Sequence, residues 1–143
     1  MTVHTRPVGA RPTRGLWAAA GPLLTAAGVS AVTVGLYFRD PHVHGSWGLC
    51  PLYAATGIYC PACGGLRGVN DAVHGHFAAA VSSNALLVPF AVWALWAWGA
   101  WLAGAFGRRI AGPPMSRAWL IGAGIVTVAF TVARNLPGSP LAP

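Results

Sequence analysis

Three long stretches without a charged residue constrain this chain more than any other feature of its sequence. They cover Leu16–Tyr37, Ala85–Phe106 and Ala118–Ala133, which are 22, 22 and 16 residues long. A helix needs about 20 apolar residues to cross the hydrocarbon core of a bilayer. The shorter third stretch can cross if Arg134 extends its guanidinium group to the interface. We therefore predict an all-α integral membrane protein with three transmembrane helices.

The composition agrees with a membrane location. Only 8% of the residues are charged, against about 25% in an ordinary soluble domain, so a soluble globule could not be covered with polar surface. We predict one membrane domain over residues 16–136, a disordered basic tail over 1–15 and a proline-rich tail over 137–143. A cleaved signal peptide would have a shorter apolar run than the first stretch. The arginine-rich, lysine-free composition suggests a bacterial genome rich in G and C.

The nine basic residues are all arginines, and their positions predict the orientation of the chain. Three lie in the N-terminal tail and three in the loop over residues 107–117, whereas only Arg39 and Arg67 lie between the first two stretches. Because Arg-rich loops stay in the cytoplasm, we predict a plasma-membrane protein with a cytoplasmic N-terminus and an extracytoplasmic segment after the first span. The arginines flank apolar runs, which indicates contact with lipid headgroups and argues against nucleic acid as a partner.

The extracytoplasmic segment over residues 42–84 holds all three cysteines. Cys60 and Cys63 are spaced i, i+3, so their sulfurs meet at the N-terminus of a helix if Cys63 opens one. The helix dipole and free N–H groups there favour thiolate. The same spacing supplies half of a zinc site, with Cys50 as a candidate third ligand. The candidate fourth ligands are His42, His44, His74 and His76.

The sequence leaves four roles of the cysteines open. They can pack as small apolar side chains, form a disulfide from Cys50 to Cys60 or Cys63, hold a metal ion, or work as a redox dithiol. An extracytoplasmic face favours a disulfide. Zinc is the candidate cofactor of the metal site. In the redox role Cys60 would be the more nucleophilic thiol and Cys63 would resolve the intermediate.

A short amphipathic or re-entrant helix is predicted directly after the cysteines, over residues 64–74. Its polar face carries Cys63, Arg67, Asn70, Asp71 and His74, and apolar residues fall on another face. We expect this helix to lie against the outer leaflet or the mouth of the helix bundle, with Arg67 paired to Asp71 one turn later. A second short helix is expected over residues 77–82, with Asn84 capping the start of the second span.

The residues around the cysteines resemble domain-of-unknown-function family 2752, a group of small bacterial membrane proteins with a CPxCGxxR signature. The matching positions are Cys50-Pro51, residues 56–67, His74-Gly75, Asn84 and, more weakly, residues 134–137. Two positions depart from the family pattern: Leu66 replaces a frequent threonine, and His76 replaces a frequent aspartate. The resemblance implies the fold and the membrane location, and it implies no particular activity.

Taken together, the pattern predicts a multi-pass membrane protein whose CPxCG segment forms a structural disulfide or a metal site. No paired carboxylates accompany the thiols, so we expect a non-enzymatic role. One alternative is a thiol redox or metal-handling protein that uses Cys60 and Cys63. Another is a scaffold for a partner membrane protein or a homo-oligomer, because small residues such as Gly99 and Ala103 let helices approach closely. Membrane lipids are the partner that the composition itself requires.

Overall fold

The computed structural model describes residues 16–142, and this part of the chain is helical without strands. Its helices are α1 (Leu16–Phe38), α2 (Pro51–Thr56), α3 (Gly65–Val73), α4 (Phe77–Ser83), α5 (Leu87–Ala105) and α6 (Arg117–Arg134). Three of them, α1, α5 and α6, are long and apolar enough to cross a membrane. The all-helical fold with three spans is therefore confirmed, and the predicted tail over residues 1–15 lies outside the described residues.

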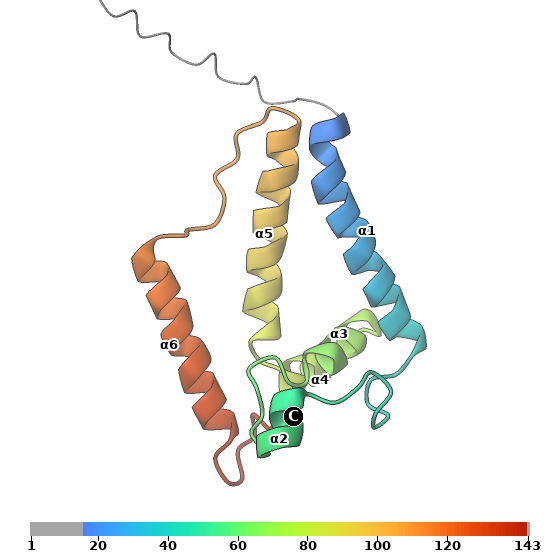
Figure 1. Ribbon diagram of the computed structural model, residues 1–143, viewed down its shortest axis with the longest axis vertical. Helices are drawn as coiled ribbons and strands as arrows, with labels where there is room; N and C mark the ends of the chain where they lie inside the picture. Colours follow the sequence, from blue (N-terminus) through green and yellow to red (C-terminus); the bar gives the residue numbers. More distant parts are fainter. Residues whose placement is uncertain (1–15, 143) are drawn as a thin grey trace, which may run out of the picture.

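The three long helices place the short ones at one end of the molecule (Figure 1). Helices α1 and α5 run side by side. Helix α6 lies farther from α5 and contacts it through the stacked rings of Trp93 and Trp119, whose centroids are 5.8 Å apart, and the C-terminal end of α6 joins the short helices. Helices α2, α3 and α4 gather where α1 ends, α5 begins and α6 ends. The chain therefore concentrates its polar segments at one membrane face.

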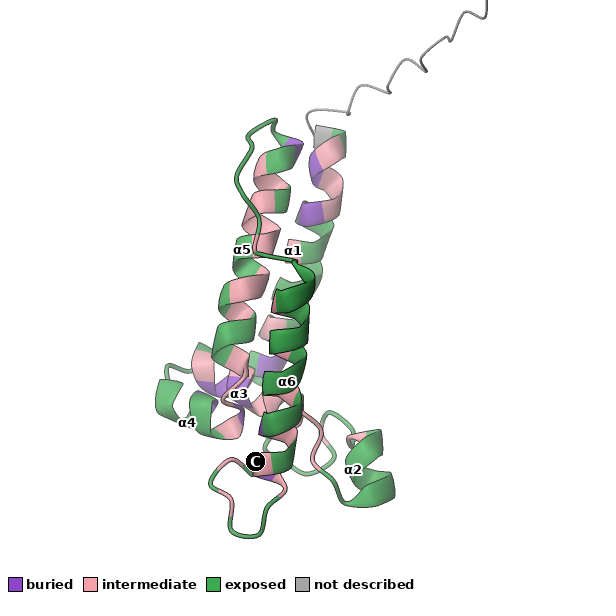
Figure 2. Ribbon diagram, turned by 90° about the vertical axis from the view of Figure 1, so that its left-hand side faces the viewer, coloured by how far each residue is buried: buried purple, intermediate pink, exposed green. Residues whose placement is uncertain are grey.

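The apolar side chains of the long helices point outward. Leu24, Leu95 and Val128 are 73%, 67% and 64% exposed, and Figure 2 shows exposed residues along most of α6. Water would make such a surface aggregate, whereas lipid tails are as apolar as these side chains. The fold is thus that of a multi-pass membrane protein.

Close packing between α1 and α5 depends on Gly21. A Cβ atom built at this position would lie 2.8 Å from Cζ2 of Trp101, so the tryptophan ring rests directly on the helix backbone. Beside it, the indole N–H of Trp98 donates a hydrogen bond of 2.9 Å to the carbonyl of Pro22. Gly99, which the sequence suggested as a packing position, has no neighbour within 4 Å of a built Cβ.

Helices α3 and α4 pack against each other and against the start of α5. Gly68 of α3 makes this possible, because a Cβ there would lie 2.7 Å from Cδ2 of Leu87 and 3.0 Å from the carbonyl of Ala80. Both short helices were expected from the sequence, whereas α2 was not. Asn84 ends α4 in an extended conformation, and its side-chain oxygen accepts a hydrogen bond of 2.9 Å from the amide of Leu86 just before α5. This contact agrees with the expected capping of the second span by Asn84.

Candidate functional site: three cysteines at one membrane face

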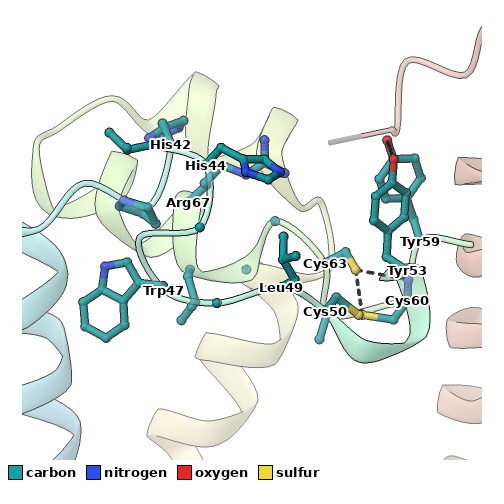
Figure 3. A pocket seen from close by; sticks show the side chains of 18 residues that line it. His42, His44, Trp47, Leu49, Cys50, Tyr53, Tyr59, Cys60, Cys63 and Arg67 are labelled. Atoms are coloured by element: carbon teal, nitrogen blue, oxygen red, sulfur yellow. Dashed lines mark hydrogen bonds between the residues drawn. The ribbon is translucent and has the colours of Figure 1, made fainter. Parts of the chain in front are cut away.

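The three cysteines converge from two separate segments. Cys50 lies directly before α2, and Cys60 and Cys63 enclose the turn that leads into α3. Their three sulfur atoms all lie within 4.8 Å of one another, and the sulfurs of Cys60 and Cys63 are 2.9 Å apart (Figure 3). All three are free thiols.

The turn that carries Cys60 and Cys63 is shaped by its own backbone. The amide of Cys63 donates to the carbonyl of Cys60 at 3.1 Å, and the amide of Cys60 donates to the sulfur of Cys63 at 3.2 Å. The next residue, Gly64, has φ 79°, a left-handed conformation that suits glycine. The chain therefore turns sharply after Cys63 and enters α3 with both sulfurs on the same side.

The side chains of Arg134 and Asn84 donate hydrogen bonds to the backbone carbonyls of this turn. The guanidinium group of Arg134 donates to the carbonyls of Cys60 at 2.8 Å and Cys63 at 3.0 Å. The amide of Asn84 donates to the carbonyls of Pro61 at 2.8 Å and Cys63 at 3.1 Å. Arg134 is only 1% exposed, so the expectation that it reaches for the membrane interface is wrong: its charge is turned inward to the cysteine turn.

Asn135 holds the chain just before the turn. Its side-chain oxygen accepts from the amide of Tyr59 at 2.8 Å, and its side-chain nitrogen donates to the carbonyl of Tyr59 at 2.9 Å. Both backbone groups of one residue are thus paired with one side chain. Through Arg134 and Asn135, the end of α6 is tied to the cysteine segment although some 70 residues separate them in the chain.

A cavity of about 580 Å³ lies in front of the sulfurs. The three cysteines form part of its wall, and Figure 3 shows polar and aromatic side chains around it. These residues include His42, His44, Tyr53, Tyr59 and Arg67. The sulfurs are therefore accessible from the space outside the helices, while the backbone that carries them is held from the opposite side.

The surroundings of Cys50 and Cys63 shift the pKa values of their thiols in opposite directions. A backbone hydrogen bond at Tyr53, together with a hydrogen bond from Cys63, lowers the pKa of Cys50 to about 7. Burial, together with hydrogen bonds to Cys60 and Cys50, raises the pKa of Cys63 to about 12. The sequence assigned the nucleophilic role to Cys60, but the thiol whose pKa is lowered is Cys50.

Comparison with known proteins places this site in a family. Residues 50–98 match the family model described as "Protein of unknown function (DUF2752)". This segment belongs to the DUF2752 family. The match starts at Cys50 and continues through the cysteine turn, α3 and α4 into α5, so it contains all three sulfurs. Neither the curated proteins nor the solved structures contain a match to the chain.

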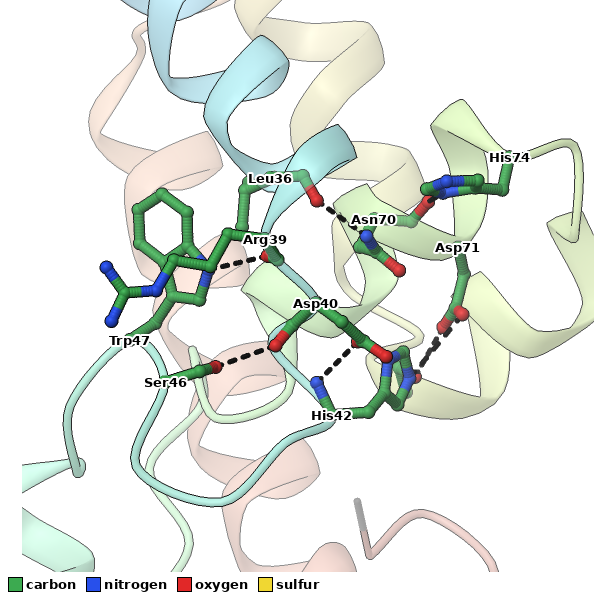
Figure 4. A network of polar contacts seen from close by, with 10 residues as sticks. Leu36, Arg39, Asp40, His42, Ser46, Trp47, Asn70, Asp71 and His74 are labelled. Carbon is green, nitrogen blue, oxygen red and sulfur yellow. Dashed lines mark hydrogen bonds and ion pairs between the residues drawn. The ribbon is translucent and has the colours of Figure 1, made fainter.

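The polar face of α3 in the DUF2752 segment fastens three neighbouring segments together (Figure 4). The side chain of Asn70 donates to the carbonyl of Leu36 at the end of α1, at 2.6 Å. Asp71 accepts from the hydroxyl of Ser83 at 2.9 Å and lies 3.5 Å from Nε2 of His42. Asn70 and Asp71 are both buried, so their role is to hold α3 against α1 and α4.

The predicted ion pair between Arg67 and Asp71 is wrong. Asp71 is turned toward α4 and the loop after α1, where Ser83 and His42 are its partners. Arg67 instead lines the cavity beside the cysteines. Four-residue spacing allowed the pair, but burial of Asp71 against α4 gave the carboxylate other partners.

His74 does not join the candidate metal ligands. Its ring stacks on Tyr37 at a centroid distance of 4.5 Å, and its Nδ1 lies 2.8 Å from the carbonyl of Asn70. The nine residues of α3 rise about 1.5 Å each, so the end of the helix is more than 10 Å from the end where the sulfurs lie. The other candidates, His42, His44 and His76, also lie outside the sulfur cluster.

Three site residues were missed by reasoning from the cysteines alone: Asn84, Arg134 and Asn135. All three support the turn through hydrogen bonds to backbone carbonyls, which spacing rules along the sequence do not reveal. The signal that could have found them is the resemblance itself, since Asn84 and the run from Arg134 to Pro137 are among its matching positions.

Proposed function

We propose that the protein binds a zinc ion through the thiolates of Cys50, Cys60 and Cys63 and that the ion has a non-enzymatic role. The observation that carries the proposal is the convergence of all three sulfurs within 4.8 Å. Zinc–sulfur bonds of about 2.3 Å in a tetrahedral site put neighbouring sulfurs about 3.8 Å apart. The sulfurs of Cys60 and Cys63 are 2.9 Å apart and no pair of the three is farther apart than 4.8 Å, so shifts of about 1 Å through side-chain rotation would form the site.

Three cysteines also favour a metal over a disulfide. A disulfide uses two sulfurs and leaves the third next to it with no bond to make. Thiolates are soft ligands that select zinc and copper(I) over magnesium or calcium. Cys50, Cys60 and Cys63 therefore form a donor set suited to zinc, and the cavity in front of them gives the ion a path of entry.

The charge of Arg134 supports an anionic cluster. This guanidinium is buried, and no carboxylate among residues 16–142 forms an ion pair with it. A buried charge without compensation is unfavourable by several kcal/mol. Zinc with three thiolates carries one net negative charge, and Arg134 binds the carbonyls of two of these cysteines. The negative charge of the zinc–thiolate cluster would therefore compensate the positive charge of Arg134.

The location we propose for the site is the extracytoplasmic face of a bacterial cell membrane. The support is the arginine count: the loop between α5 and α6 carries Arg108 and Arg109, next to the end of α5 that is opposite the cysteines, and Arg117 follows as the first residue of α6. Loops rich in arginine stay in the cytoplasm. A maleimide that cannot cross membranes should label the reduced, metal-stripped cysteines in whole cells, and labelling in inverted vesicles alone would reverse the orientation.

A redox dithiol is the second candidate, favoured by two observations. The sulfurs of Cys60 and Cys63 are 2.9 Å apart, and the pKa of Cys50 is lowered to about 7. A thiolate beside a pair of thiols can attack a disulfide formed between them. This role would require reversible oxidation of Cys60 and Cys63 by a partner, with two electrons and two protons leaving for each disulfide formed.

Metal analysis of the detergent-purified protein tests the proposal. We expect one zinc per chain, lost in Cys50→Ser, Cys60→Ser and Cys63→Ser. His74→Ala, a change at the far end of α3, should keep the zinc and serves as the matched control. A zinc-free protein with one stable disulfide would overturn the metal site, and reversible thiol oxidation without zinc would favour the redox role.

A further inference from the structure

We infer that the zinc site takes its fourth ligand from outside the chain, as a small thiolate whose carboxylate is bound by Arg67. The inference rests on the proposed zinc site and adds a ligand class to it. It starts from the cavity of about 580 Å³ whose wall contains both the three sulfurs and Arg67. Cavities of this size are typical of small-molecule sites.

The described residues do not offer a fourth protein ligand. Zinc bound by protein is almost always four-coordinate. The group of candidate ligand atoms around the sulfurs comprises Cys50, Cys60 and Cys63 alone among residues 16–142. His42, although it lines the cavity, is held by Asp40 at 2.8 Å and faces Asp71 at 3.5 Å. A ligand that enters through the cavity completes the coordination without moving these segments.

The positive charge of Arg67 favours a ligand with a negative charge. Arg67 is the one arginine in the cavity wall, and no aspartate or glutamate lines this cavity. In the part of the chain that the structure describes, its guanidinium forms no hydrogen bond and no ion pair. A planar guanidinium fits a carboxylate with two parallel hydrogen bonds. The cavity therefore combines a soft ion with a free carboxylate receptor.

The path between the two receptors favours a short ligand. Arg67 lies in the first turn of α3, Cys63 lies in the turn just before that helix, and both line the same cavity. Gly64 and Gly65 between them carry no side chain into this space, and both line the cavity. A short ligand that carries both a thiolate and a carboxylate can therefore bind the ion and the guanidinium within this one cavity. The ligand class is thus a short mercaptocarboxylate, such as cysteine or 3-mercaptopropionate.

Cobalt-substituted protein gives a direct test, because thiolate-to-cobalt absorption reports each sulfur added to the ion. We would titrate full-length protein in detergent with 3-mercaptopropionate and with 2-mercaptoethanol, which lacks the carboxylate. Wild-type protein should bind the acid at least about tenfold more tightly, since tenfold corresponds to about 1.4 kcal/mol and a charge-assisted hydrogen bond contributes about 1.5–3 kcal/mol. Arg67→Gln should lose this preference, and Arg108→Gln, at the other membrane face, should keep it.

The outcomes separate the inference from the function on which it rests. Failure to bind one cobalt per chain would overturn the zinc site itself. Stoichiometric cobalt binding with equal affinity for both thiols, or with a preference that survives Arg67→Gln, would overturn only the ligand class. A cobalt spectrum changed by His44→Ala without added thiol would show that a histidine fills the fourth position, which would also overturn the inference.

Discussion

Replacing Arg134 with methionine should loosen the cysteine turn without removing a sulfur. The guanidinium forms two short hydrogen bonds, 2.8 Å to the carbonyl of Cys60 and 3.0 Å to that of Cys63. Each hydrogen bond from a charged donor contributes about 1.5–3 kcal/mol, and part of the sum is offset by desolvation of the buried charge. We therefore expect Arg134→Met to lower the free energy of unfolding by about 3 kcal/mol.

The assay is equilibrium unfolding of metal-free protein in mixed detergent micelles, so that zinc binding does not mask the change. Arg117→Met is the matched control, because Arg117 starts the same helix at its other end and is exposed; its effect should be within about 0.5 kcal/mol. Zinc competition with a chelator should then show weaker binding in Arg134→Met. Equal stabilities of the two variants would refute the role of Arg134 as the support of the turn.

Three further predictions concern the backbone and the thiols. Gly64→Ala should destabilise the protein by about 1–2 kcal/mol, because φ is 79° there, whereas Gly65→Ala, with no atom within 4 Å of the new Cβ, should be neutral or stabilising in the same unfolding assay. Gly68→Ala should lower the free energy of unfolding by about 1–3 kcal/mol through overpacking between α3 and α4; an unchanged melting temperature would contradict that contact. In reduced, metal-free protein, the rate of alkylation at Cys50 should level off above pH 7, its pKa being about 7, whereas Cys63, with a pKa of about 12, should react slowly up to pH 9. Mass spectrometry of the alkylated peptides measures both, and identical pH profiles would contradict the difference.

The spans and the short helices could be predicted because their signals are local. An uncharged run of sufficient length determines a transmembrane helix whatever surrounds it, and each predicted span matches α1, α5 or α6 to within two residues. The meeting of Cys60 and Cys63 is also local, since three residues separate them. Helix α2 was missed because its six residues carry only a weak signal, a proline at the start and Gly57 at the end.

The supports of the site could not be predicted because they are distant in sequence. Arg134 and Asn135 reach a turn more than 70 residues away, and nothing in the local pattern of α6 indicates that its last arginine is buried. The stripe on α3 was identified correctly as polar, but its partners were not. Asp71 met Ser83 and His42 instead of Arg67, because only the packing of α4 determines which polar groups are buried together.

X-ray absorption at the zinc edge tests the central claim most directly, because it counts the sulfur atoms bonded to the ion. For protein purified with its zinc, three thiolates from Cys50, Cys60 and Cys63 predict three chain-derived sulfur neighbours at about 2.3 Å. Cys50→Ser should reduce that number to two. A shell of nitrogen and oxygen atoms alone, or a count of two sulfurs that Cys50→Ser leaves unchanged, would contradict a three-cysteine zinc site.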